Sequence, residues 1–170
     1  MSPDASMMKV DTPEKAKPVP PDVHHELHGY YYEDLSVGMA ATYSRTVSEA
    51  DIAKFAGLSG DTNPIHLSED FAKATFFEGR IAHGMLSASY ISTVIGTKLP
   101  GPGCVYVSQS LRFKGPVRAG DTVNTRATIT AFNDEKSRVT MWCECFVGRT
   151  VILEGEAIIQ VPRRTPVVAG

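Results

Sequence analysis

The sequence has no long hydrophobic run and no excess of charge of either sign. No stretch of its 170 residues approaches the roughly 20 apolar residues of a membrane-spanning helix, and the first residues lack the apolar segment of a secretory signal. Lys and Arg number 17 against 19 Asp and Glu, so no basic arm indicates a nucleic-acid partner. We therefore expect a cytoplasmic protein that binds neither membrane nor nucleic acid.

Cysteine is also scarce, with three residues in the chain. Cys143 and Cys145 are two positions apart on an expected strand, which puts them on one face at about 7 Å. This separation is too long for an easy disulfide, and no histidine follows at the spacing of a metal site. The sequence predicts buried, reduced thiols, which suit a reducing cytoplasm.

The N-terminal segment has little apolar material and no hydrophobic period. Five of the eleven prolines fall within the first 21 residues. We interpret residues 1–28 as a flexible, proline-rich tail, with packing onto the domain near Tyr30–Tyr32 as the alternative. An exposed tail is favoured over a metal site formed by His24, His25 and His28 of this segment. The domain is expected over residues 29–163, with a C-terminal tail at 164–170.

The first half of the domain predicts short elements before one long helix. Residues 39–47 read as a strand, and Ser48 and Asp51 match a capping box that opens a helix ending at Gly57 or Gly60. Residues 60–66 are predicted to be non-helical because of Pro64. Ser68 should cap a short helix, and residues 84–99 have the apolar spacing of a central helix.

The second half of the domain reads as strands joined by short turns. The expected strands cover residues 105–113, with an interruption at Gln109, and then 123–131, 139–147 and 151–161. Sequential strands of this kind form an antiparallel meander. The fold class is therefore α+β, with a curved antiparallel sheet wrapped around a central helix. Its open edges favour pairing with a second copy of the chain.

Reactive motifs are few. The chain has no Gly-x-Ser-x-Gly element, no phosphate-binding loop and no dinucleotide fingerprint. Outside the tail it has two histidines, His66 and His83. His66 follows Asp61 across a loop that Pro64 stiffens, and a carboxylate and an imidazole that meet on one water can share its activation. Such a pair can equally be structural, so the spacing alone leaves both interpretations open.

A second candidate feature lies at the start of the central helix. Free amides at a helix N-terminus carry partial positive charge, and Gly84 would let a ligand approach that backbone. A thioester carbonyl placed there would gain negative charge as an enolate and be stabilised. Gly84 could instead be a close-packing glycine, and His83 is expected to hydrogen-bond backbone. Together the parts suit addition of water to a conjugated thioester, with no metal and no cofactor.

Three sequence stretches resemble the MaoC-like, (R)-specific enoyl-CoA hydratases of the hotdog-fold superfamily. They run over residues 59–66, residues 81–86, and residues 108–117 with Gly120-Asp121, and the most specific combination is Asp-x-Asn-Pro-x-His at 61–66 followed by His-Gly-Met at 83–85. The resemblance covers roughly residues 30–162. It implies a hotdog fold, fatty acid metabolism, an acyl-CoA substrate, and a homodimer with a substrate tunnel near its interface.

The resemblance also implies individual roles. Asp61 and His66 would activate the catalytic water, and the Gly84 amide would contact the oxyanion. Ser92 matches a helix serine that helps to position the aspartate, and Asn63 a residue that shapes the loop. The implied reaction is reversible hydration of trans-2-enoyl-CoA to (R)-3-hydroxyacyl-CoA.

Three alternatives stay open at this point. One is a dehydratase for 3-hydroxyacyl groups on acyl-carrier protein, the same chemistry with another carrier. The second is a hotdog thioesterase, against which the Asp-x-Asn-Pro-x-His element argues. The third is a non-catalytic subunit that binds acyl thioesters. Arg112, Lys114 and Arg118 could contact carrier phosphates, although such residues more often form a solvated face.

Overall fold

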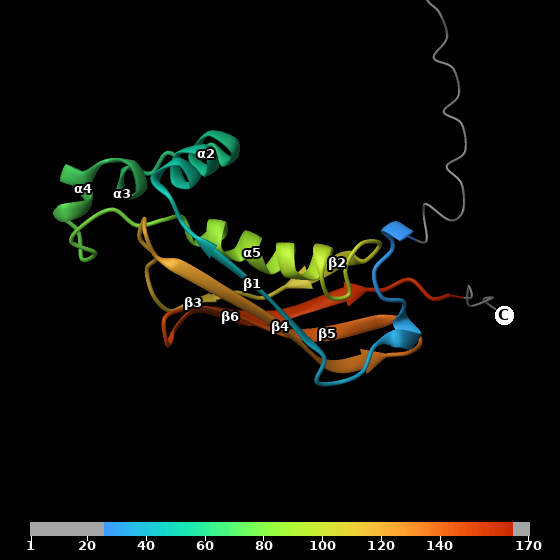
Figure 1. The fold of residues 1–170 in the computed structure, drawn as a ribbon. Coiled ribbons are helices and arrows are strands. Elements are labelled where there is room, and N and C mark those ends of the chain that lie inside the picture. The colour runs from blue at the N-terminus through green and yellow to red at the C-terminus, as the bar shows by residue number, and fades with distance from the viewer. Residues whose placement is uncertain (1–25, 165–170) are drawn as a thin grey trace, which may run out of the picture.

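The computed structural model of the chain describes residues 26–164 and consists of a sheet, a central helix and a group of short helices (Figure 1). The elements are, in chain order, η1 (Tyr32–Asp34), β1 (Ala40–Thr46), α2 (Glu49–Ser59), α3 (Pro64–Leu67), α4 (Glu69–Lys73), α5 (Gly84–Thr97), β2 (Val105–Gln109), β3 (Arg112–Phe113), β4 (Thr122–Asn133), β5 (Arg138–Val147) and β6 (Thr150–Gln160). In this part of the chain no helix is long and apolar enough to cross a membrane.

The strands form one antiparallel sheet in the order β1-β4-β5-β6-β2, and β3 pairs with β6 beside β2. Three long sequential strands, β4, β5 and β6, make the meander that the sequence predicts. Interruption of the preceding strand at Gln109 is also confirmed, because β2 ends there and β3 begins at Arg112.

The central helix α5 lies along one face of this sheet, and α2, α3 and α4 project at one end of the molecule (Figure 1). Its apolar side chains are buried, with Val94 and Ile95 fully inaccessible. The facing residues of β5 alternate as expected, and Val139, Met141, Cys143 and Cys145 are fully buried. The predicted α+β architecture, a sheet wrapped around a central helix, is therefore confirmed.

The local signals at the first helices are mostly confirmed. The side chain of Ser48 accepts from the amide of Asp51, whose carboxylate accepts from the Ser48 amide, and α2 ends at Gly60 with a left-handed φ of 77°. The prediction that residues 60–66 are wholly non-helical was wrong. α3 begins at Pro64 after Asn63 caps it, because a proline at the first helical position lacks only an amide that would have no partner there.

The cysteines are free thiols. Burial raises the pKa of Cys143 to about 12 and that of Cys145 to about 11. Both side chains therefore stay protonated at neutral pH and act as small apolar groups in the core.

The two ends of the described chain meet at the end of the sheet away from α2–α4 (Figure 1). Tyr32 donates from its hydroxyl to Asp134 at 2.9 Å, and the guanidinium of Arg163 lies 4.3 Å from its ring centroid. Tyr31 stacks on His28 at 4.1 Å and lies under Arg164. The sequence suggested no role for these tyrosines. Residues 1–25 and 165–170, including His24 and His25, lie outside the described residues.

Candidate active site

The loop between α2 and α3 is shaped by its own polar side chains. After Gly60 ends α2, the Asp61 carboxylate accepts from the amide of Asn63 at 3.2 Å. The Asn63 side chain accepts in turn from the amide of Ile65 at 3.2 Å and so caps α3. These two bonds, together with Pro64, turn the chain so that His66 lies on the first turn of α3. The structure therefore places Asn63 where the sequence predicts a loop-shaping residue.

Asp61, His66 and His83 converge. One ligand atom from each side chain lies within 4.8 Å of the others, and the two imidazole rings are 3.8 Å apart between centroids. Both histidines are buried, whereas Asp61 is exposed in the single chain. A water molecule or another small ligand at this point could contact a carboxylate and an imidazole together. By spacing alone the cluster would also suit a divalent cation.

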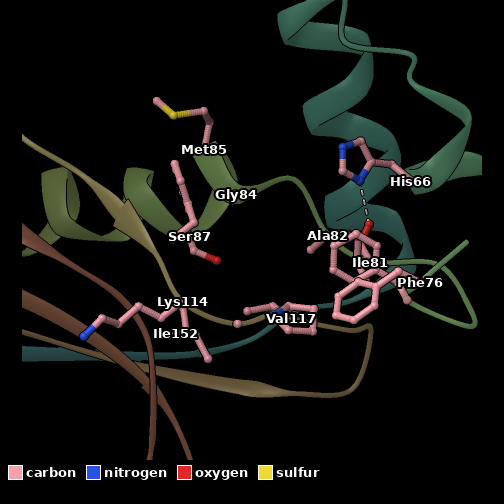
Figure 2. Close-up of a pocket in the computed structure, with 14 residues that line it drawn as sticks. His66, Phe76, Ile81, Ala82, Gly84, Met85, Ser87, Lys114, Val117 and Ile152 are labelled. Carbon is pink, nitrogen blue, oxygen red and sulfur yellow. Dashed lines mark hydrogen bonds between the residues drawn. The ribbon is translucent and has the colours of Figure 1, made fainter.

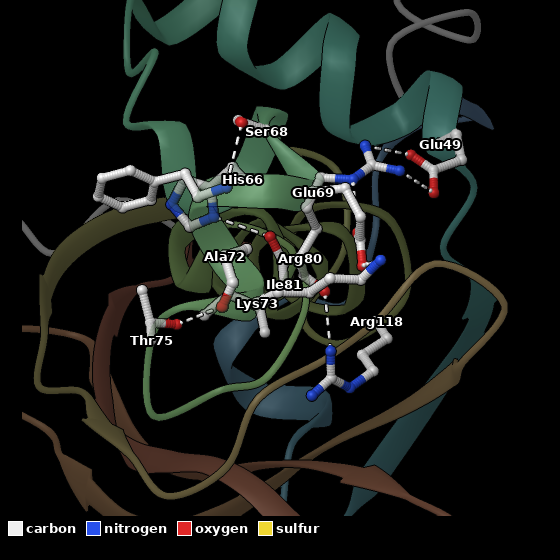
Figure 3. Close-up of polar contacts among 11 residues, drawn as sticks. Glu49, His66, Ser68, Glu69, Ala72, Lys73, Thr75, Arg80, Ile81 and Arg118 are labelled. Carbon is white, nitrogen blue, oxygen red and sulfur yellow. Dashed lines mark hydrogen bonds and ion pairs between the residues drawn. The ribbon is translucent and has the colours of Figure 1, made fainter.

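His66 has a defined orientation because one ring nitrogen is occupied. Its Nδ1 lies 2.8 Å from the carbonyl oxygen of Ile81 (Figure 3). A carbonyl can only accept, so Nδ1 carries the proton, and in the neutral ring Nε2 keeps its lone pair. The backbone thereby sets the tautomer, as outer hydrogen bonds do for functional histidines. His66 is left with one nitrogen that can take or orient a proton of a ligand.

His83 acts as an anchor for the loop. Its Nε2 donates to the backbone carbonyl of Asp61 at 2.9 Å, as expected of a backbone-bonded histidine. Its ring also packs against Phe55 at 5.1 Å. Within residues 26–164 its Nδ1 is buried without a hydrogen-bond partner. His83 precedes α5, so this bond ties the Asp61 loop to the start of the central helix.

Gly84 is the first residue of α5, and no side chain caps this helix end. Its amide has no hydrogen-bond partner in the described chain. A Cβ at this position would lie 2.6 Å from a ring carbon of Phe113, so the aromatic ring occupies the space that a side chain would need. Gly84 is therefore closely packed and its amide is free, and a role of this amide as an oxyanion contact stays a prediction.

His66 and Gly84 line one pocket of about 510 Å³ (Figure 2). Most of the remaining walls are apolar, and they come from the α4–α5 segment, α5 itself, the β3–β4 connection and β6. Some of the lining residues, Ile81, Met85, Phe113 and Val117, fall in the stretches that carry the resemblance, whereas Phe76, Phe77, Ser87 and Ile152 do not. An adjacent pair of aromatic residues in an expected loop, at 76–77, was the available signal. Asp61 and His83 contribute to the cluster with His66 but are not among the residues that line the pocket.

Ser92 lies elsewhere. It is exposed on α5, eight residues beyond Gly84, which corresponds to about 12 Å along the helix axis. No hydrogen bond joins it to Asp61 within residues 26–164. A single chain therefore does not bring these two side chains together, and the role implied for Ser92 stays a prediction.

Comparisons with known proteins identify the family of the chain. A family model described as MaoC like domain matches residues 36–143. The chain belongs to the MaoC-like family. It is 55% identical over 135 residues to the (R)-specific enoyl-CoA hydratase of Rhodospirillum rubrum, covering 79% of this chain and 94% of that protein. It is 48% identical to the 3-hydroxybutyryl-CoA dehydratase of Methylorubrum extorquens, covering 82% and 88%.

Solved structures of MaoC-like proteins show the same architecture. The (R)-hydratase of Aeromonas caviae matches with a TM-score of 0.74 and 42% identity, over 76% of this chain and 99% of that one. The R-hydratase of Pseudomonas aeruginosa gives 0.75 and 38%, over 84% and 97%. The fold is therefore the hotdog fold, as the sequence resemblance implied. The chain is an enzyme of the hydratase and dehydratase type, a carbon–oxygen lyase.

Proposed function

We propose that this enzyme catalyses the reversible hydration of trans-2-enoyl-CoA to (R)-3-hydroxyacyl-CoA. The observation that carries the proposal is the convergence of Asp61 and His66 beside a pocket whose other wall presents the free amide of Gly84. Relatives at 55% and 42% identity are named (R)-specific enoyl-CoA hydratases, which supports the same reaction and substrate class here.

In the proposed mechanism a water molecule lies between the Asp61 carboxylate and the His66 imidazole. Its oxygen attacks C3 of the enoyl thioester, and the proton that it loses passes to the carboxylate. The electron pair of the double bond moves toward the thioester oxygen, where the Gly84 amide stabilises the enolate. The enolate then collapses, and C2 takes the proton that the Asp61 carboxyl group received, relayed by His66, which restores the carboxylate; His66 also orients the attacking water.

Each group suits its proposed role. The bond from Nδ1 to Ile81 leaves Nε2 of His66 free to accept from water. No side chain caps the amide of Gly84, so the thioester oxygen can accept from this amide without displacing another group. The apolar walls exclude water from the rest of the pocket, which strengthens the interaction of the amide with a developing charge.

The proposal is tested by Asp61→Asn, which keeps the shape of the side chain and removes the base. We expect hydration to fall by about 10²- to 10⁴-fold with an unchanged unfolding transition, because the exposed carboxylate is not part of the core. Asp70→Asn, an exposed carboxylate on α4, is the matched control and should keep full activity. Chiral analysis of the product should show the (R) isomer. Substantial turnover by Asp61→Asn would refute the assignment.

A second substrate carrier is supported by one comparison. The chain is 36% identical over 132 residues to the mitochondrial 3-hydroxyacyl-[acyl-carrier-protein] dehydratase of Arabidopsis thaliana, covering 75% of this chain and 78% of that protein. The chemistry is the reverse reaction on another carrier. Paired assays of one acyl group on CoA and on acyl-carrier protein decide between the two, and we expect the CoA thioester to have the higher kcat/KM.

We also propose that the enzyme works as a homodimer. The β2 and β3 edge exposes Val105, Val107 and Phe113, and open apolar edges favour pairing. Sedimentation of the purified chain should give a mass near twice the monomer mass. A monomer with full activity would contradict this proposal.

A further inference from the structure

The orientation of His66 depends on a segment that lies outside the catalytic loop. Residues 75–83 connect α4 to α5, and Ile81 pairs with α3 through both of its backbone groups. Its amide donates to the carbonyl of Ile65 at 3.3 Å, and its carbonyl accepts from Nδ1 of His66 at 2.8 Å. The position of the Ile81 carbonyl therefore determines which nitrogen of His66 is protonated and where the other one points.

The side chain of Arg118 hydrogen-bonds to two backbone carbonyls of this segment. Its guanidinium donates through Nη1 to the carbonyl of Arg80 at 3.1 Å (Figure 3), and through Nη2 to the carbonyl of Phe77. The segment packs closely against this guanidinium at Gly79, because a Cβ there would lie 3.0 Å from Nη1 of Arg118. The amide of Arg118 donates to Asp121 at 2.8 Å. The arginine thus joins the turn before β4 to the segment that carries Ile81.

The side chain of Arg80, which belongs to the same segment, forms ion pairs with two helices. Its guanidinium donates to both carboxylate oxygens of Glu49 on α2, each at 2.9 Å, and to Glu69 on α4 at 3.3 Å. The residue before Ile81 is therefore fixed through its carbonyl and through its side chain. Exposed ion pairs of this kind contribute little to global stability, so the main consequence is local geometry.

We propose that Arg118 is a positioning residue for His66, acting through the carbonyls of residues 77 and 80 and the adjacent Ile81 carbonyl. From sequence alone this arginine was a candidate for phosphate contact or a solvated face. The contacts instead direct two of its donors into the protein backbone. The inference rests on the proposed function for its kinetic consequence, whereas the orientation of His66 can be measured independently of turnover.

Arg118→Met tests the proposal because it keeps the aliphatic stem and removes both donors. Loss of an outer hydrogen bond that orients a functional histidine typically costs about 10- to 100-fold, and we expect this loss in kcat with KM changed less than threefold. Arg118→Lys has one compact ammonium group in place of the two-pronged guanidinium donor, so its kcat should lie between those of wild type and Arg118→Met. Methylguanidinium added to Arg118→Ala should restore part of the lost kcat.

The matched control is Arg126→Met, because Arg126 is an exposed arginine on β4 whose side chain contacts only the Thr128 hydroxyl among the described residues. It should behave as the wild type. Imidazole ¹⁵N–¹H spectra supply a readout that needs no substrate: His66 should be an Nδ1–H tautomer in wild type and Arg126→Met, and a mixture in Arg118→Met.

The outcomes separate the two proposals. A wild-type enzyme that hydrates no enoyl thioester would refute the proposed function, and the spectra would still test the positioning role. An Arg118→Met variant with unchanged kcat and an unchanged His66 tautomer would overturn the positioning role. A loss confined to KM would also overturn it, because it would place Arg118 in contact with the carrier.

Discussion

Replacing Gly84 by alanine would put a methyl group between the start of α5 and the ring of Phe113. The new Cβ would lie 2.6 and 2.9 Å from two ring carbons. Ordinary contact begins near 3.4 Å, so the ring must retreat by roughly 1 Å. Phe113 is 54% exposed in the single chain, so its ring has room to turn there, although the β2 and β3 edge proposed for pairing includes it. The substitution therefore perturbs the wall of the pocket and the space in front of the free amide.

The structure predicts a small effect of this substitution on stability and a large effect on activity. Alanine is favoured over glycine by roughly 0.5–1 kcal/mol in the middle of a helix, and the smaller gain at this first helical position offsets part of the cost of moving the ring. A misplacement of about 1 Å at a reacting group can lower the rate on the order of 10²-fold, or about 2.7 kcal/mol in the activation free energy. We expect Gly84→Ala to fold normally and to lose about this much kcat/KM.

The assay compares hydration kinetics and urea unfolding of Gly84→Ala and Gly96→Ala. Gly96 is also on α5, but a Cβ there would meet nothing within 4 Å, so this control should keep its activity. The double variant Gly84→Ala/Phe113→Ala removes the displaced ring and separates blockage by the methyl group from blockage by the ring. Wild-type kcat/KM in Gly84→Ala would refute the reasoning that the Gly84 amide contacts the substrate.

Two further predictions concern stability and its dependence on pH. Hydrogen bonds from Ser48, followed by the one from Arg45, lower the pKa of Asp51 to about 2. A carboxylate with a depressed folded-state pKa stabilises the fold above about pH 4, and this contribution is lost as pH falls toward 2. Asp51→Asn should therefore lower the free energy of unfolding by about 1 kcal/mol at pH 7, and the difference should vanish in urea titrations near pH 2. The pKa values of Cys143 and Cys145 are raised to about 12 and 11, so the stability linked to these thiols is complete below about pH 9 and is lost as pH rises toward 11–12. Iodoacetamide should alkylate them at pH 8.5 only after denaturation, and rapid alkylation of the native protein would contradict their burial.

The sequence predicted those elements whose signals are local. The capping box at Ser48, the left-handed Gly60, the apolar spacing of α5 and the alternation along β5 each depend on residues within one element. Their periodicities follow from backbone geometry, so the sheet and its central helix could be predicted. The first turn of α3 was missed because Pro64 was interpreted as excluding a helix, although at the first helical position it is compatible with one.

The candidate site was predictable only in part. Residue type, spacing and the resemblance singled out Asp61, His66 and Gly84, and their catalytic roles stay predictions. The contacts that orient them join residues far apart in sequence, such as His66 with Ile81 and Arg118 with Phe77. Every residue has a backbone carbonyl, so residue types do not show which carbonyl accepts a hydrogen bond. An arginine on an expected turn also looks the same in sequence whether its side chain contacts solvent or backbone. The sequence could not show which residues wall the pocket for the same reason, because the walls come from segments far apart in the chain.

The contact between Tyr31, His28 and Arg164 has a consequence for engineering the enzyme. It brings the first and last described segments side by side, at the end of the sheet opposite α2–α4 (Figure 1). Chains whose ends lie close together tolerate circular permutation. A short linker could connect residues 28 and 164, with new ends opened at the exposed turn of Gly148 and Arg149 between β5 and β6. The pocket residues would keep their positions around α5 in space. The point of attachment to a support or a second enzyme would move to the turn between β5 and β6.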